Sequence, residues 1–99
     1  MTTAKPDLDR SLHAISDPVR RRILQALKER KAQAAAGKSG LCAGDVEECV
    51  RLSQPTISHH MAVLTKAGLV TAVKQGQWRW YSRNESAIRV LIKTLRSKL

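Results

Sequence analysis

Aromatic side chains are scarce in this sequence, which has two Trp, one Tyr and no Phe among its 99 residues. Leu, Ile, Val and Ala must therefore fill the core, which suits a small helical fold. No apolar run is long enough to span a bilayer, and the N-terminus has no hydrophobic stretch like that of a signal peptide. These absences predict one domain with no membrane partner and a cytoplasmic location, in which cysteines stay reduced.

Acidic residues are also few. The chain has 8 Asp and Glu against 18 Lys and Arg, which leaves a net charge of +10. In a domain of this size, such an excess predicts a polyanion as the binding partner. The alternative is a basic surface that serves solubility alone.

Patterns typical of enzymes and of metal sites are missing as well. We find no nucleophile–base pair, no glycine-rich phosphate loop and no pair of catalytic carboxylates. The three histidines, His13, His59 and His60, show no spacing typical of metal ligands. We therefore expect no enzymatic activity, no cofactor and no bound metal.

What the sequence does contain is a well-delimited helix between Ser53 and Gly68. Ser53 can cap its first turn with a side-chain hydrogen bond, Pro55 fits within that turn, and Gly68 suits a left-handed stop. One narrow face is apolar at helical spacing: Ile57, Met61 and Leu64. The opposite face carries hydrogen-bonding side chains: Gln54, Thr56, Ser58, His59 and Lys66. A face of this kind suits the major groove of DNA.

A shorter helix is expected just before it, from Asp45 to Arg51. Its inward residues should be Val46, Cys49 and Val50, and Leu52-Ser53 make a tight connection to the next helix. Two short helices in this arrangement, over residues 44–67, form the helix-turn-helix pattern.

The periodicity changes to that of β-strands over residues 69–83. Two β-rich runs, 69–74 and 78–82, flank Gln75-Gly76-Gln77, which can form a hairpin turn. Polar and basic side chains gather at its tip: Lys74, Gln75, Gln77 and Arg79. A two-stranded hairpin is marginal alone, so it should lean on the helices as a wing.

Three further helices complete the expected fold. One runs over residues 7–16, a second starts at Asp17 and Pro18, and a last one, capped by Asn84, covers residues 85–99. The second should extend through residues 32–36 and stop at Gly37, before a loop, and residues 1–6 should form a disordered tail. Arg20, Arg21 and Arg22 oppose the helix dipole, so they either meet a phosphate backbone or are solvated or paired within the chain.

The first and last helices are expected to form a dimer interface. Their apolar residues make stripes that a small body cannot cover, and DNA half-sites are usually read by two-fold dimers. The interface residues should be Leu8, Leu12, Ile88, Leu91, Ile92 and Leu95. The alternative is that these stripes pack on the chain's own core.

Two motifs resemble the ArsR/SmtB family of arsenic repressors. Residues 12–24, LHAISDPVRRRIL, resemble its opening motif, and residues 52–64, LSQPTISHHMAVL, resemble its recognition-helix motif. Ala67-Gly68-Leu69-Val70, Gly76 and Trp80-Tyr81 match its wing. The resemblance covers about residues 8–95 and implies a dimeric winged helix-turn-helix repressor that a signal releases from its operator.

The resemblance also suggests which residues contact DNA. Gln54, Ser58 and His59 occupy base-facing positions, Ser53 and Thr56 occupy positions that contact or brace phosphates, and Gln77 and Arg79 lie on the wing. Lys74 joins them at the wing tip. His60, which shares a face with Ile57 and Leu64, should be structural.

The signal is not expected to be a metal. Metal-sensing members of this family have a Cys-x-Cys pattern before the helix-turn-helix, whereas here Cys42 is followed by Ala43 and Gly44. The last helix contains no histidine, so the family's other metal site is missing too. Similar members with one cysteine respond to oxidants or reactive sulfur, which makes Cys42 a candidate thiol sensor. The alternative is that Cys42 and Cys49 are small core residues.

The combined prediction is a mainly α protein with about five helices and a two-stranded wing, forming one winged helix-turn-helix domain over residues 1–99 that dimerises. Its expected function is that of a sequence-specific DNA-binding transcriptional regulator. The alternative is a winged-helix module that binds RNA or protein, since the fold does not determine the partner.

Overall fold

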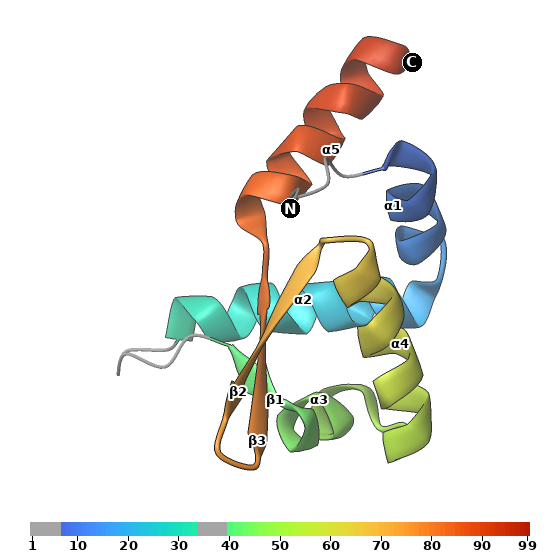
Figure 1. Ribbon diagram of the computed structural model, residues 1–99. Coiled ribbons are helices and arrows are strands. Elements are labelled where there is room, and N and C mark those ends of the chain that lie inside the picture. Colours follow the sequence, from blue (N-terminus) through green and yellow to red (C-terminus); the bar gives the residue numbers. More distant parts are fainter. Residues whose placement is uncertain (1–6, 34–39) are drawn as a thin grey trace.

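The computed structural model describes residues 7–33 and 40–99. In the described part, the order of elements is α1 (Leu8–Ile15), α2 (Pro18–Gln33), β1 (Leu41–Cys42), α3 (Ala43–Val50), α4 (Gln54–Lys66), β2 (Val70–Gln75), β3 (Trp78–Arg83) and α5 (Glu85–Lys98). Figure 1 shows α5 and α1 at one end of the molecule, with α3 and the tip of the β2–β3 hairpin at the other. The predicted tail over residues 1–6, and the predicted stop at Gly37, lie outside the described residues.

Side-chain caps start three of the helices, and those at Asp17 and Asn84 were predicted. Asp7 accepts hydrogen bonds from the first turn of α1, Asp17 from the N–H groups of Val19 and Arg20, and Asn84 from the N–H of Ala87. Each carboxylate or amide oxygen satisfies a donor that the helix itself leaves unpaired. These caps explain why α2 and α5 begin where the sequence predicts, and the Asp7 cap explains why α1 begins at Leu8.

Helix α4 ends at Lys66, and the left-handed stop that follows it is Gly68, as predicted, with a φ of 80°. The N–H of Leu69 donates to the carbonyl of Leu64, and the N–H of Gly68 to that of Thr65, at 3.1 and 3.0 Å. This double closure needs a left-handed residue, which glycine adopts without strain. The chain therefore turns directly from α4 into β2.

The sheet has three antiparallel strands in the order β1-β3-β2, rather than the two strands predicted. Leu41 pairs with Tyr81 and Cys42 with Trp80. Gly40 makes this approach possible, because its φ is 113° and a Cβ there would overlap the carbonyl oxygen of Tyr81. A two-residue strand is too short to show a period-2 pattern, so the sequence could not predict β1.

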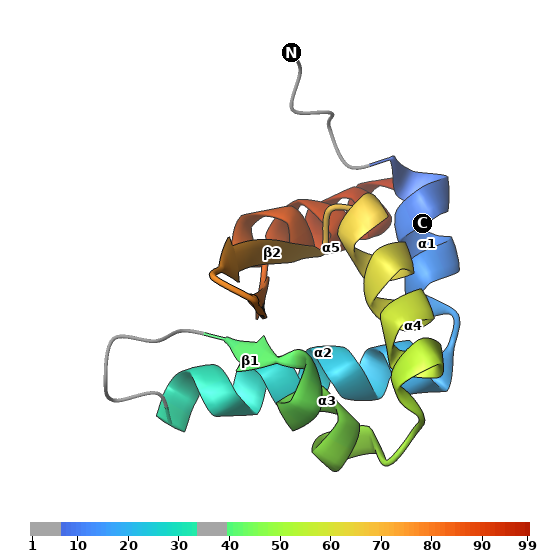
Figure 2. The same ribbon diagram turned by 60° about the horizontal axis from the view of Figure 1, so that its bottom comes forward.

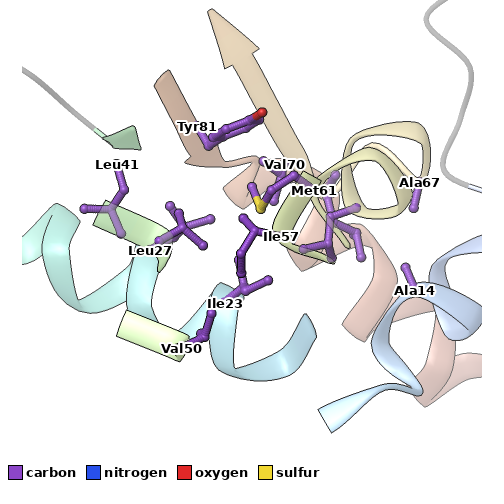
Figure 3. Packing of buried hydrophobic residues seen from close by; sticks show 14 of the residues in the cluster. Ala14, Ile23, Leu27, Leu41, Val50, Ile57, Met61, Ala67, Val70 and Tyr81 are labelled. Carbon is purple, nitrogen blue, oxygen red and sulfur yellow. The ribbon is translucent and has the colours of Figure 1, made fainter. Parts of the chain in front are cut away.

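The core lies where α2, α3, α4 and the sheet meet. Figure 3 shows Ile23 and Leu27 of α2 beside Ile57 of α4, with Val70 and Tyr81 of the sheet above them. Val46 and Val50 complete the buried face of α3, but Cys49, predicted to point inward, is exposed. The buried face of this eight-residue helix is wide enough for the two valines only.

In both views, α1 and α4 lie together at the N-terminal end of α2 (Figures 1 and 2). Leu91 of α5, predicted to lie in a dimer interface, belongs to the chain's own core at 6% exposure.

Within residues 7–33 and 40–99, no helix combines the length and apolar character that crossing a membrane requires.

Candidate nucleic-acid interface

The polar face of α4 points to solvent along its whole length. Its exposed side chains are Gln54, Thr56, Ser58, His59 and Lys66. Ile57, Met61 and Leu64, on the other side, are at most 1% exposed. This burial fixes the rotation of the helix, so the hydrogen-bonding face is presented outward as predicted.

Ser53 starts α4 differently from the prediction. It is the N-cap residue, with extended φ and ψ of −67° and 155°, but its side chain makes no hydrogen bond to a backbone N–H of the first turn. Its hydroxyl oxygen instead lies 3.0 Å from that of Thr56. The two hydroxyls, both exposed, present one paired polar group beside the first turn of the helix.

The wing turns over Gly76, whose φ is 64°, and the turn brings Gln75 opposite Trp78. Lys74 pairs in register with Arg79, so two cations project from the same face of the hairpin. Like charges directly opposite each other destabilise a hairpin, and a bound anion would remove that cost. The arrangement therefore favours an anionic partner at the wing.

Trp78 is 59% exposed at the wing tip and was not among the residues predicted to contact DNA. Its position in the sequence could have indicated this exposure, because Trp78 lies immediately after the turn, where the two strands alone cannot cover a large indole. An exposed Trp combines a wide apolar face with one N–H donor, a combination common at binding interfaces.

A hollow of about 290 Å³ lies between α4 and the wing. The residues that line it are Ser58, Met61, Ala62, Thr65, Lys66, Ala72, Arg79 and Tyr81. It therefore brings together Ser58 and Arg79, both predicted to contact DNA, with Lys66, which was predicted to lie on the polar face of the helix. Among these described lining residues, the charged side chains are both cations.

The charged residues in α4 and the wing are all basic. Residues 49–84 contain no Asp or Glu but five cations: Arg51, Lys66, Lys74, Arg79 and Arg83. Arg83 is held by Glu85, with Nε 2.9 Å from Oε2. The other four are exposed: Arg51 caps the end of α3, Lys66 lies on α4, and Lys74 and Arg79 lie on the wing. This surface is therefore positive, without an opposing carboxylate from its own segment.

His60 lies behind the polar face and is buried, as predicted for a structural residue. Its Nδ1 lies 3.2 Å from Nη1 of Arg20, which is also buried. Desolvation, helped by the charges of Arg20 and His59, lowers the pKa of His60 below its usual value, although the carboxylate of Asp17 opposes this. Around neutral pH the ring is therefore uncharged.

The three arginines at the start of α2 have different surroundings. Arg20 is buried among hydrogen bonds, and Nη1 of Arg21 donates to the carbonyl of Ile15 at 2.7 Å. Both are thus paired within the chain, although Arg21, like Arg22, is exposed. Of the two alternatives for these cations, pairing within the chain holds for Arg20 and Arg21.

Asp17, which caps α2, stabilises this corner. Although desolvation alone would raise it, the pKa of the Asp17 carboxyl is lowered by hydrogen bonds from the N–H groups of Val19 and Arg20 and by the Arg20 charge. Its Oδ2 lies 3.8 Å from Nη1 of Arg20. The buried guanidinium therefore has a counter-charge close by.

Cys42 is half-buried at the N-cap of α3, and Cys49 is exposed. Neither is a fully buried core residue. Within the part of the chain that the structure describes, no three His, Cys, Asp or Glu side chains are grouped as metal ligands would be.

The predicted dimer residues lie on α1 and α5, which contact each other. Ile92 is 59% exposed and Leu12 38% exposed, while Leu8, Ile88 and Leu95 are half-buried. A hollow of about 250 Å³ runs beside α5, lined mainly by Ile15, Leu24, Leu69, Ile88, Ile92 and Leu95. Apolar surface thus remains uncovered along this helix.

Comparison with known proteins gives a consistent set of similarities. Residues 15–73 match the model of a helix-turn-helix domain family. The chain is 37% identical over 75 residues to the transcriptional repressor SdpR of Bacillus subtilis, which covers 76% of this chain and 73% of that protein. It is 37% identical over 89 residues to an arsenical resistance operon repressor of Staphylococcus aureus, which covers 90% of this chain and 77% of that protein.

A solved structure is similar in fold. The homodimeric winged helix-turn-helix DNA-binding domain Mb0332 of Mycobacterium bovis, described as a possible ArsR-family regulator, superposes with a TM-score of 0.69. The match covers 92% of this chain and 77% of that chain at 18% sequence identity. At this identity, the likeness concerns the fold.

Proposed function

The chain belongs to the ArsR family of winged helix-turn-helix transcriptional regulators, and from this premise we propose that it is a repressor that binds a DNA operator as a homodimer and is released by a signal. The observation that carries the proposal is the surface formed by α4 and the wing. That surface combines an exposed hydrogen-bonding helix face with cations and comes from a segment without acidic residues.

The roles of individual residues follow from their positions. Gln54, Ser58 and His59 project from the exposed face of α4 and would read base edges in the major groove. Ser53 and Thr56 would contact or brace phosphates beside the first turn. Lys74, Gln77 and Arg79 on the wing, together with Lys66 at the hollow, would meet the backbone of the same duplex.

The homodimer is supported by the apolar surface of α5, where Ile92 and Val90 are about half or more exposed. A second copy related by a two-fold axis would cover Leu12, Ile92 and the half-buried Leu8, Ile88 and Leu95. The similar fold of Mb0332 is homodimeric, which agrees with this assembly. Two copies of α4 would then address two half-sites of the operator.

Binding to RNA or protein instead of DNA is the less favoured alternative. Double-stranded RNA has a major groove too deep and narrow for side chains to read. The exposed face of α4 suits a wider groove, and two relatives above 30% identity are named as repressors. Duplex DNA is therefore the better-supported partner.

The test is DNase I footprinting of the DNA upstream of the protein's own gene with the purified full chain. We expect a protected, two-fold symmetric site whose half-sites are about 10 base pairs apart, or a multiple of that spacing. An unrelated duplex and an RNA of matched length serve as competitors. If either competitor displaces the protein as well as the protected duplex does, operator recognition is contradicted.

A further inference from the structure

The Arg20 guanidinium joins three helices through its three nitrogens. Nε donates to the carbonyl of Ala14 at 2.6 Å, Nη2 to the carbonyl of His13 at 3.1 Å, and Nη1 contacts Nδ1 of His60 at 3.2 Å. The two carbonyls belong to the C-terminal turn of α1, and that of His13 also accepts hydrogen bonds from the N–H and the hydroxyl of Ser16. Arg20 itself belongs to α2, and His60 to the recognition helix α4.

We infer that Arg20 and His60 are positioning residues for DNA recognition: a hydrogen bond from Arg20 to neutral His60 holds α4 against the C-terminal end of α1. The inference rests on the proposed function, because it assigns a role in operator reading to residues that do not touch DNA. Both side chains are buried, at 6% and 8% exposure, and lie on the side of α4 away from its polar face.

The chemistry of the two groups determines the protonation state. A guanidinium has only N–H donors and stays charged at any pH that proteins tolerate. Nδ1 of His60 must therefore be the acceptor, which means that the ring is neutral and carries its proton on Nε2. A protonated imidazole would present an N–H to another N–H and a positive charge to a buried cation, so the contact would be lost.

The charges around His60 come from two helices. Asp17 and Arg20 of the α2 corner face it, and His59 lies next to it on α4 with ring centroids 5.6 Å apart. The Asp17 carboxylate lies close to Arg20, with Oδ2 3.8 Å from Nη1, so it partly compensates that guanidinium. Within this cluster, protonation of His60 is therefore the change that would break the hydrogen bond from Arg20.

Losing this bond would affect α4 as a unit. His60 lies in the middle of the helix, one residue from His59 and two from Ser58 on the exposed face. A helix moves as a rigid element, so a shift at His60 would move both side chains relative to the bases. Non-specific binding depends on charge rather than on register, so it should change much less.

The experiment compares His60→Asn with His60→Leu and the wild type. The amide oxygen of Asn occupies the place of Nδ1 and accepts a hydrogen bond but cannot be protonated, whereas Leu fills the volume without an acceptor. Affinity for the footprinted operator and for an unrelated duplex is measured at about pH 7.5 and about pH 5.5, where histidine changes charge. His13→Gln is the matched control, because it removes an exposed imidazole on α1.

We expect the wild type and His13→Gln to lose about tenfold in operator affinity on acidification relative to His60→Asn, a typical allosteric coupling. The ratio to His60→Asn cancels any effect of His59, which both proteins retain. His60→Leu should bind the operator weakly at both pH values while keeping its affinity for unrelated DNA. Nitrogen-detected NMR of the wild-type imidazoles should find His60 in the Nε2–H form at neutral pH.

Two results would overturn the inference and leave the proposed function intact. One is operator binding by the wild type and His60→Asn with the same pH profile. The other is an NMR spectrum in which Nδ1 of His60 carries the proton at neutral pH. If the wild type binds the operator no better than unrelated DNA at either pH, the proposed function fails, and the recognition role of Arg20 and His60 fails with it.

Discussion

Cys42 donates its thiol hydrogen to Asp45, with Sγ 3.2 Å from the carboxylate oxygen Oδ2, and the backbone N–H of Cys42 donates to the same oxygen at 3.2 Å. The two residues thus close the turn that starts α3, the first helix of the helix-turn-helix. The thiol is half-buried and belongs to this hydrogen-bonded turn, whereas Cys49 seven positions later is exposed.

Mild peroxide should therefore weaken operator binding through Cys42. Peroxide is reduced to water as it converts the thiol to a sulfenic acid, which places an extra oxygen between sulfur and Asp45. We expect a loss of about 1–3 kcal/mol in operator affinity by fluorescence anisotropy. Cys42→Ser should not respond and Cys49→Ser should, while zinc and arsenite should have no effect on the wild type. An equal response in Cys42→Ser would make the thiol irrelevant to the signal.

The base-reading role of α4 can be tested at Gln54. Truncation to Ala removes a side chain able to bond two base-edge atoms, so Gln54→Ala should cost roughly 1–3 kcal/mol on the operator. Its affinity for an unrelated duplex should stay close to that of the wild type, because phosphate contacts remain. Equal losses on both duplexes would show that Gln54 does not read sequence.

The wing should contribute charge rather than specificity. Lys74→Ala and Arg79→Ala should weaken binding to all duplexes, and each should reduce the slope of log affinity against log salt by about one. Lys98→Ala, which removes an exposed cation from the last residue of α5, is the matched control. Figure 1 shows this end of α5 far from the tip of the hairpin. If the slope stays unchanged in Lys74→Ala and Arg79→Ala as well as in the control, the wing does not contact the DNA backbone.

Dimerisation should depend on Ile92 and not on Leu91. Ile92 is 59% exposed on α5, so Ile92→Glu leaves the monomer core intact but would bury an unpaired carboxylate at the interface, which costs several kcal/mol. We expect monomers in sedimentation velocity and loss of tight operator binding. Ser86→Glu adds the same carboxylate at an exposed position in the first turn and should remain dimeric. A dimeric Ile92→Glu protein would move the interface off this part of α5.

Thermal stability should fall in two stages on acidification. The folded-state pKa values of His60 and Asp17 both lie below the usual 6.5 and 3.8, so each group binds its proton more weakly in the folded chain than in the unfolded one. The stabilisation is complete above the usual pKa and is lost as the pH falls toward the folded value. His60→Asn should remove the loss that begins below about pH 6.5, and Asp17→Asn the loss below about pH 3.8.

Circular dichroism melts across this range provide the measurement, with His13→Gln as the control for an exposed histidine. If the melting temperature of His60→Asn declines below pH 6.5 as steeply as that of the wild type, another group is responsible.

Features that depend on residues a few positions apart could be predicted from the sequence. Asp17, Asn84 and Gly68 mark helix ends because a cap or a left-handed stop is completed within about four residues. The same holds for the apolar stripe of α4, which sets its polar face toward solvent. The motifs that resemble the ArsR/SmtB family lie in these segments, so the family could also be recognised from the sequence.

Contacts between distant segments escaped prediction. The strand β1 exists because Leu41 and Cys42 meet β3 some 40 residues later. Cys49 was expected inside, but the neighbours of α3 cover only Val46 and Val50. The hydroxyl of Ser53 contacts the hydroxyl of Thr56 and not a backbone N–H, and residue spacing alone does not distinguish these two outcomes.

The sequence by itself determined the helices, their caps, the recognition face and the family, because these follow from local periodicity and short motifs. Only the tertiary structure decided which cations remain free for DNA. It buries Arg20 under the end of α1 and against His60, while Arg79 and Lys66 stay at the hollow beside α4. The physical reason is that desolvation and hydrogen bonding depend on what packs nearby in space. Arg20 and Arg22 lie two positions apart with the same local propensities, yet Arg20 is buried and Arg22 is exposed.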